Sequence, residues 1–178
     1  MRGLLLGFLL GIAAVVAGAY YLLQRGAIDL GADNAPSGIE SKIAMKSVDA
    51  WAARHAADKR NPLAASEENI TAGATLYLNH CAGCHGVPSN PQSQFQRSFY
   101  PPAPGFFREM PEMNDSTTFY VIQRGIRWTG MPAWNRTLSD AQIWQIVVFF
   151  DNMHKLPASA QKVFEQSAAR VSGTKQQN

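Results

Sequence analysis

The stretch Cys81-Ala-Gly-Cys84-His85 places two thiols three positions apart and a histidine directly after the second thiol. This is the C-x-x-C-H pattern by which haem is attached covalently to a polypeptide. The two thiols can form thioethers with the vinyl groups on one side of the porphyrin, and the histidine then lies under the ring with an imidazole nitrogen on iron. The pattern predicts one covalently bound haem c, held by Cys81, Cys84 and His85.

Three other roles for the two cysteines fit the sequence less well. A redox dithiol would follow a strand within a βαβ unit, whereas a helix is expected before Cys81. A structural zinc site would need two further ligands, and His55, His80 and His154 do not stand at zinc spacing. A disulfide between Cys81 and Cys84 would be strained. Covalent haem attachment therefore fits these cysteines best.

The N-terminal segment is apolar over residues 4–23, which are twenty consecutive positions without a charge. A helix of this length can span a bilayer, and Tyr20 and Tyr21 near its end suit the membrane interface. The competing interpretation is a cleaved signal peptide with Ala17-Gly18-Ala19 as the cleavage site. The apolar run continues past that site, so we expect a retained single-pass anchor over residues 1–25. Either interpretation sends the remaining chain across a membrane.

The 178 residues have room for one ordinary domain and its attachments. No stretch alternates with period two, so an all-α fold without a sheet is expected. Helices are expected over residues 47–57, 67–79 with Ser66 as N-cap, 116–124 with Asp115 as N-cap, and 139–153 with Ser139 as N-cap. The expected organisation is an anchor (1–25), a linker with a short helix (26–65), the haem domain (66–157) and a C-terminal tail with a helical turn or two (158–178).

Residues 86–114 combine six prolines with five aromatic residues. No regular helix or central strand can form across so many prolines. The aromatic side chains still need burial, so we expect an irregular segment wrapped around something large and apolar.

The charge pattern and the absence of nucleotide-binding motifs argue against two classes of partner, nucleic acids and nucleotides. Sixteen Lys and Arg against thirteen Asp and Glu give a net charge of +3, and the basic excess belongs to the ends of the chain. No basic stripe with interleaved aromatics is present, so no nucleic-acid partner is expected. No G-x-x-x-x-G-K or G-x-G-x-x-G pattern is present either, which leaves nucleotide binding without support.

The chain resembles class I cytochromes c over residues 66–157. The resemblance is carried by Gly73-x-x-x-Tyr77 before Cys81, by Gly130-Met131-Pro132-Ala133-Trp134 and by Leu138-Ser139-Asp140. It is greatest to membrane-anchored monohaem bacterial cytochromes, including domains of respiratory-complex cytochrome subunits. This resemblance implies a small cytochrome c helical bundle around one haem. It also implies that Gly73 permits a close helix crossing and that Tyr77 packs near Ile146 and Phe149.

The sixth iron ligand is expected to be Met131, which stands in a loop between two expected helices where the resemblance places the distal ligand. Met110 and Met113 in the proline-rich segment are the alternatives. His/Met ligation fills both axial positions, which favours fast electron transfer and disfavours oxygen or peroxide binding. Four further residues are candidates for contacts with the haem propionates or the distal face: Arg124, Arg127, Trp128 and Trp134. The alternative is that the arginines are solvated and the tryptophans belong to the core.

The predicted function is a membrane-tethered one-electron carrier between respiratory donor and acceptor proteins, without a small-molecule substrate and not an enzyme. Its expected location is the bacterial cytoplasmic membrane, with the haem domain on the periplasmic side. An alternative is a fixed cytochrome c subunit of a larger membrane oxidoreductase complex, which an exposed face at Val48 and Trp51 would favour. A peroxidase or gas sensor would need an open iron position, and one C-x-x-C-H motif excludes a dihaem peroxidase.

Overall fold

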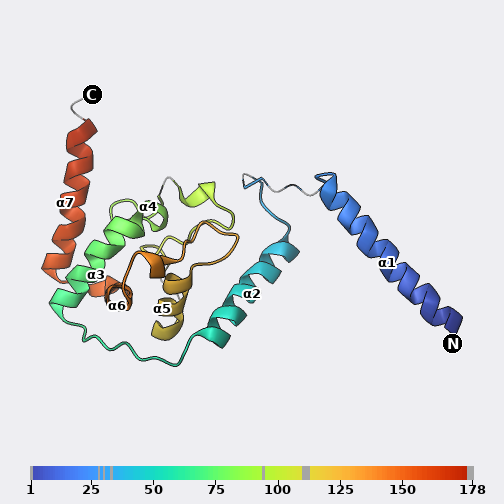
Figure 1. The fold of residues 1–178 in the computed structure, drawn as a ribbon. Helices are drawn as coiled ribbons and strands as arrows, with labels where there is room; N and C mark the ends of the chain where they lie inside the picture. Colours follow the sequence, from blue (N-terminus) through green and yellow to red (C-terminus); the bar gives the residue numbers. More distant parts are fainter. Residues whose placement is uncertain are drawn as a thin grey trace. The chain divides into compact units, whose positions relative to one another are not determined.

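The computed structural model describes residues 2–27, 29, 31–32, 34–93, 95–109 and 113–175. It divides into two compact units, Met1–Asn34 and Ala35–Asn178. The described residues form seven α-helices and three short 3-10 helices, and their only β-type pairing is an isolated bridge between Val87 and Asn90 (Figure 1). The expected all-α class is confirmed.

The first unit contains one helix, α1 (Arg2–Gln24), with a mean hydropathy of 2.2 and no buried residue. Leu, Ile, Val and Phe side chains are exposed on all sides of this helix. Their exposure is unfavourable in water and favourable in hydrocarbon. By length and composition α1 can cross a membrane, a property that signal sequences share.

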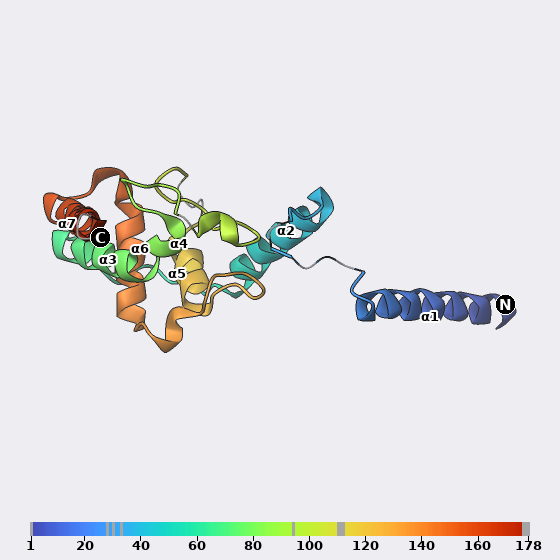
Figure 2. The ribbon, with the colours of Figure 1, turned by 90° about the horizontal axis from the view of Figure 1, so that it is seen from above.

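The second unit is built around three helices: α3 (Glu67–His80), α6 (Asp140–Asp151) and α7 (Ala158–Lys175). In Figures 1 and 2, α6 crosses α3 and α7 lies beside α3. Tyr77 is fully buried at the centre of this core, with its ring centroid 5.1 Å from that of Phe149 and 6.4 Å from that of Phe164. The expected packing of Tyr77 against the last helix of the haem domain is confirmed.

Gly73 lies where α3 meets α6. A Cβ atom there would overlap the carbonyl oxygen of Gln145 and would lie 2.8 Å from the Cβ of Phe149. The two backbones can approach this closely only because position 73 has no side chain. The expected role of Gly73 in the crossing is confirmed.

The N-caps of α3 and α6 are those expected from the sequence. Ser66 accepts a hydrogen bond from the backbone N–H of Asn69, and Ser139 forms a reciprocal capping box with Gln142. The prediction for α5 (Asp115–Arg124) was wrong by one residue. Asn114 is its N-cap and accepts from Thr117, while Asp115 occupies the first turn. Both residue types suit both positions, so only the backbone geometry separates them.

Helix α2 (Gly38–His55) begins nine residues earlier than the expected helix at 47–57. Ser37 caps it by accepting from the N–H of Glu40. The helix packs on the same unit, because the Trp51 ring lies 5.1 Å from the Tyr120 ring of α5 and Ala52 is fully buried. Val48 and Trp51 are half-buried against this unit. The exposed face that would have favoured a subunit of a larger complex is therefore not observed at these two residues.

The prediction of one or two helical turns after residue 158 was also wrong. Helix α7 continues to Lys175, and Ala160 and Phe164 are buried against α3 and its neighbours. The Phe164 ring lies 5.6 Å from that of Phe107. Most helical stability in proteins comes from tertiary packing of an apolar face, so these contacts stabilise α7.

Candidate functional site

The two cysteines and the histidine of the C-x-x-C-H motif share one helical turn. Cys81 follows the last residue of α3, and α4 (Ala82–His85) continues directly from it. The backbone N–H groups of Cys84 and His85 both donate to the carbonyl of Cys81, at 3.1 and 2.9 Å. Both thiols are free, with Cys81 buried and Cys84 half-buried. The turn therefore presents two cysteine side chains and one imidazole within five consecutive positions.

Burial, with a smaller contribution from the nearby Cys84, raises the pKa of the Cys81 thiol to about 12. The thiol therefore stays protonated at neutral pH. A redox-active dithiol needs the opposite, a cysteine whose pKa is lowered so that the thiolate can attack. The Cys81 thiol has the opposite shift.

The His85 ring is 8% exposed and is fixed by two contacts. Its Nδ1 lies 2.8 Å from the carbonyl oxygen of Pro104, and the Phe106 ring stacks on it at 4.3 Å between centroids. A carbonyl can only accept, so Nδ1 carries the hydrogen and the lone pair is left on Nε2. Burial lowers the pKa of His85 and favours the neutral ring. A neutral imidazole with its Nε2 lone pair available is the form that binds a metal.

Sequence reasoning missed Pro104, because its carbonyl is contributed by the backbone from 19 positions away. The chain reaches it by turning sharply after the motif. Gly86 has φ +85°, and a Cβ there would lie 2.6 Å from the carbonyl oxygen of Pro91. The buried Tyr77 hydroxyl donates to the Gly86 carbonyl at 2.8 Å, and Ser93 Oγ donates to the Cys84 carbonyl at 3.0 Å.

The described residues of the proline-rich segment form no α-helix and one short 3-10 helix, η1 (Gln96–Ser98), as its composition predicts. Phe106 and Phe107 pack against the core, whereas Phe95 is exposed. This segment therefore closes over the motif from one side, through Pro104 and Phe106.

Met131 lies in a tightly closed loop that follows α5. Thr129 Oγ1 donates to the Ile126 carbonyl and accepts from the Met131 N–H, and Ile126 N donates to the Met131 carbonyl at 3.1 Å. Gly125, at φ +64°, allows Pro132 to pack on it, since a Cβ would lie 2.5 Å from the Pro132 carbonyl carbon. The Met131 side chain is half-buried and packs against the hydrophobic core. Its backbone is therefore held by local hydrogen bonds.

The Met131 loop reaches the motif end of α3. Trp134, in the short helix η2 (Trp134–Arg136), lies edge-on to His80 with 5.1 Å between centroids, and His80 directly precedes Cys81. A Cβ on Gly130 would lie 2.5 Å from the ring of Phe99, which belongs to the proline-rich segment. Three separate parts of the chain therefore meet at this end of α3.

The remaining candidates lie in different settings. Met113 is exposed, and Met110 lies outside the described residues. Arg124 and Arg127 are exposed, and Trp128 is 92% exposed with a left-handed backbone at φ +61°. Such a conformation is unfavourable for an aromatic residue.

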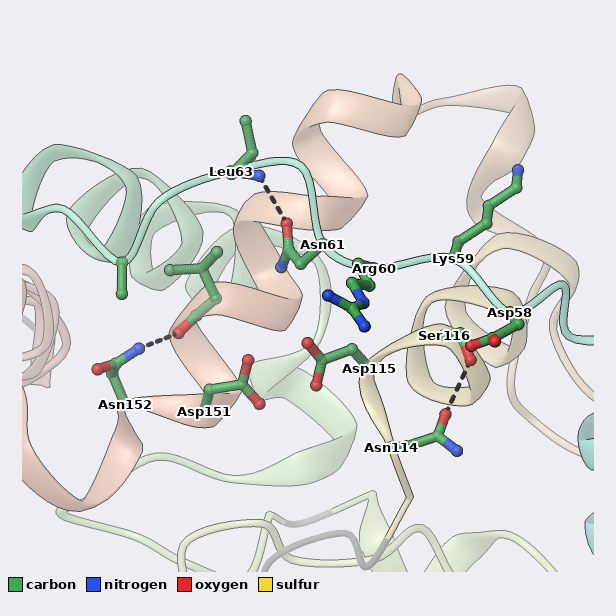
Figure 3. A pocket seen from close by; sticks show the side chains of 12 residues that line it. Asp58, Lys59, Arg60, Asn61, Leu63, Asn114, Asp115, Ser116, Asp151 and Asn152 are labelled. Atoms are coloured by element: carbon green, nitrogen blue, oxygen red, sulfur yellow. Dashed lines mark hydrogen bonds between the residues drawn. The ribbon is translucent and has the colours of Figure 1, made fainter.

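A polar cleft of about 560 Å³ contains no residue of the motif (Figure 3). Residues 58–65 cover one side, and the ends of α5 and α6 supply the rest. Figure 3 shows the carboxylates of Asp115 and Asp151 on the same side of the cleft, with Arg60 nearby. Burial, and then the charge of Asp115, raise the pKa of Asp151 from 3.8 to about 6.

Asp151→Asn is expected to stabilise the second unit at pH 7.5 but not at pH 4. The folded-state pKa lies above the unfolded value, so the ionised carboxylate opposes folding and stability falls as the pH rises from about 4 through 6. Because Asp151 is exposed on one side, the gain should be below about 1 kcal/mol. Urea unfolding at both pH values measures this gain in unfolding free energy. Equal gains at pH 4 and pH 7.5 would contradict the raised pKa of Asp151.

Residues 68–150 match the family model described as cytochrome C oxidase, cbb3-type, subunit III, a range that includes the motif and Met131. No curated protein matches the chain. Among solved structures, the chain is similar to one from the reducing HAO-like protein complex of Kuenenia stuttgartiensis, with 22% sequence identity and a TM-score of 0.42. The similarity covers 50% of this chain and 45% of that chain.

Proposed function

We propose that residues 68–150, which match the cytochrome family model, form a class I c-type cytochrome domain and that the chain is a membrane-tethered one-electron carrier with a single covalent haem c. Cytochrome c domains transfer electrons, and α1 can supply the tether. The carrier exchanges electrons with a donor and an acceptor protein at the outer, periplasmic face of a bacterial cytoplasmic membrane. The domain would comprise residues 66–157, after an anchor over residues 1–25.

The observation that carries the proposal is the chemistry of the donor groups on α4. Two cysteines share one helical turn with a buried imidazole whose Nδ1–H is donated to the Pro104 carbonyl. This set fits haem c, with Cys81 and Cys84 as attachment points and His85 as an axial ligand. Haem c bound there would supply a one-electron ferrous/ferric couple. Pro104 would fix the orientation of the imidazole and raise its basicity, as outer partners of metal-bound histidines do.

Met131 is proposed as the second axial ligand. Its closed loop, its half-buried side chain and the contact of Trp134 with His80 support this role. A loop fixed by its own hydrogen bonds can hold a thioether in one place at little entropic cost. With Met131 as a second ligand the haem iron would have no open position for oxygen or peroxide, as a carrier requires.

Met131→His is expected to lower the midpoint potential by about 100 mV or more, because the soft thioether favours ferrous iron more than imidazole does. Potentiometric titration of the visible spectrum measures the change. Met113→His is the matched control, since Met113 is exposed in the proline-rich segment, and its potential should stay at that of the unaltered protein. A shift in Met113→His with none in Met131→His would move the ligand to residue 113.

The same titration tests the function. The full-length protein should give a single one-electron wave, and carbon monoxide should leave the ferrous spectrum unchanged. Two waves, or a carbon monoxide complex at full occupancy, would overturn the proposal of a monohaem carrier with both axial positions filled.

A fixed subunit of a larger membrane oxidoreductase is the second candidate. The match to a family described as an oxidase subunit favours it, whereas the half-buried Trp51 removes one reason to expect a protein interface there. Purification in mild detergent separates the two candidates, because a free carrier runs alone and a subunit co-purifies in fixed stoichiometry.

A further inference from the structure

Helix α2 has an inner face that is covered by its own unit. Ala52 is fully buried, the Trp51 ring lies 5.1 Å from that of Tyr120, and Ser41 Oγ lies 3.1 Å from the Tyr100 hydroxyl. These contacts fix the rotation of the helix about its axis. The opposite face therefore points away from the second unit.

That opposite face carries apolar side chains near the start of the helix. At about 100° per residue, Ile39, Ile43 and Ala50 share one line on the side away from Ala52. Ile39 is 73% exposed and Ile43 is 63% exposed. We call this face the outer strip, and its members are Ile39, Ile43, Lys46, Ala50, Ala53 and Arg54.

The charges around the outer strip are distributed unevenly. Lys46 and Arg54 lie on either side of its centre line, each about 40° from it, and both are exposed. Glu40 and Asp49 lie about 80° and 100° from the same line. The strip therefore combines isoleucines with flanking cations and has no acidic group at its centre. Lys and Arg in these positions can extend toward lipid phosphates while the apolar side chains enter the interface.

Only a short linker separates this strip from α1 in the sequence. Thirteen residues, 25–37, separate the end of α1 from the start of α2. Even at full extension thirteen residues reach no more than about 45 Å. Because α2 is packed on α5, only the residues before α2 link this unit to α1. Ile39 and Ile43 stand at the tethered end of α2, so their effective concentration at the membrane is high.

We propose that the outer strip of α2 lies on the anionic lipid surface of the membrane that α1 spans. The proposal rests on the membrane tether of the proposed function. Charge complementarity and the short tether favour lipid over a protein partner. Since the inner face of α2 is packed on α5, this contact would hold the cytochrome domain in a restricted orientation above the bilayer.

A nitroxide label tests the proposal in the full-length chain, reconstituted in nanodiscs that contain phosphatidylglycerol. Ile43→Cys and Ile39→Cys carry the label in two separate variants, and Gln161→Cys on the exposed surface of α7 is the control. Power saturation compares collisions with oxygen, which enters lipid, and with a water-soluble nickel chelate. At residues 39 and 43 the ratio of oxygen to nickel collisions should be several-fold higher than at residue 161. In nanodiscs of phosphatidylcholine alone, or with Lys46→Glu and Arg54→Glu together, the difference should shrink.

Labels at residues 39 and 43 that are as accessible to nickel as the label at 161 would overturn the lipid contact. Protection that appears only when another protein co-purifies would assign the strip to that protein and also overturn it. A chain that stays outside the nanodisc fraction would instead refute the tether, and the lipid contact with it. This readout involves no electron transfer, so failure of the lipid contact alone leaves the carrier function intact.

Discussion

Exported protein with Cys81→Ala and Cys84→Ala together is expected to have the mass of the bare polypeptide. The chain has two cysteines in all, so the double variant retains no thiol that could form a thioether with a porphyrin vinyl group. His85 and Met131 could still bind iron, but only reversibly. Intact-mass measurement and haem staining after denaturing electrophoresis detect the covalent link, and each single variant should stain more weakly than the unaltered protein.

Gly83→Ala is the matched control for this experiment. Gly83 lies between the two cysteines on the same turn, and nothing lies within 4 Å of an added Cβ. The variant keeps both thiols and His85 and should carry haem at the normal level. Staining of normal strength in the double cysteine variant would refute the attachment assignment.

Gly73→Ala is expected to destabilise the second unit by about 3 kcal/mol or more. The added Cβ would overlap the backbone carbonyl of Gln145, and a backbone group cannot rotate away as a flexible side chain can. Helices α3 and α6 would have to separate, and contacts of the buried Tyr77 and Phe149 would be lost with them. Guanidinium unfolding followed by far-ultraviolet circular dichroism measures the loss.

Gly38→Ala provides the comparison for the helix crossing. Gly38 is the first residue of α2, and an added Cβ there meets nothing within 4 Å. Its unfolding free energy should change by no more than about 0.5 kcal/mol. An equally small change for Gly73→Ala would mean that α3 and α6 can move apart without cost. That result would contradict the role assigned to Gly73 in the crossing.

Features encoded within a few neighbouring residues were predictable. The caps at Ser66 and Ser139 follow from a side chain that reaches the N–H three residues on. The proline-rich segment is irregular because proline removes donors and fixes φ. The start of α5 shows the limit of such reasoning, because Asn114 and Asp115 are both competent caps and their order was decided by the backbone.

Features that depend on partners far along the chain were not predictable in the same way. The extent of α7 depends on the contacts of Phe164 with Tyr77 and Phe107, and the sequence alone indicated a tail with a helical turn or two. The docking of α2 depends on Tyr120, about seventy positions after Trp51. Neither contact leaves a periodic signal in the sequence.

The amino-acid sequence by itself determined the apolar helix at the N-terminus and the C-x-x-C-H turn, because local composition and spacing specify each of them, whereas the helix crossing at Gly73 was implied only by the resemblance to class I cytochromes c. The tertiary structure alone decided that Pro104 receives the Nδ1–H of His85, that α2 turns Ile39 and Ile43 outward, and that α7 joins the core. These depend on which distant surfaces fit together, and that fit exists only once the chain has folded.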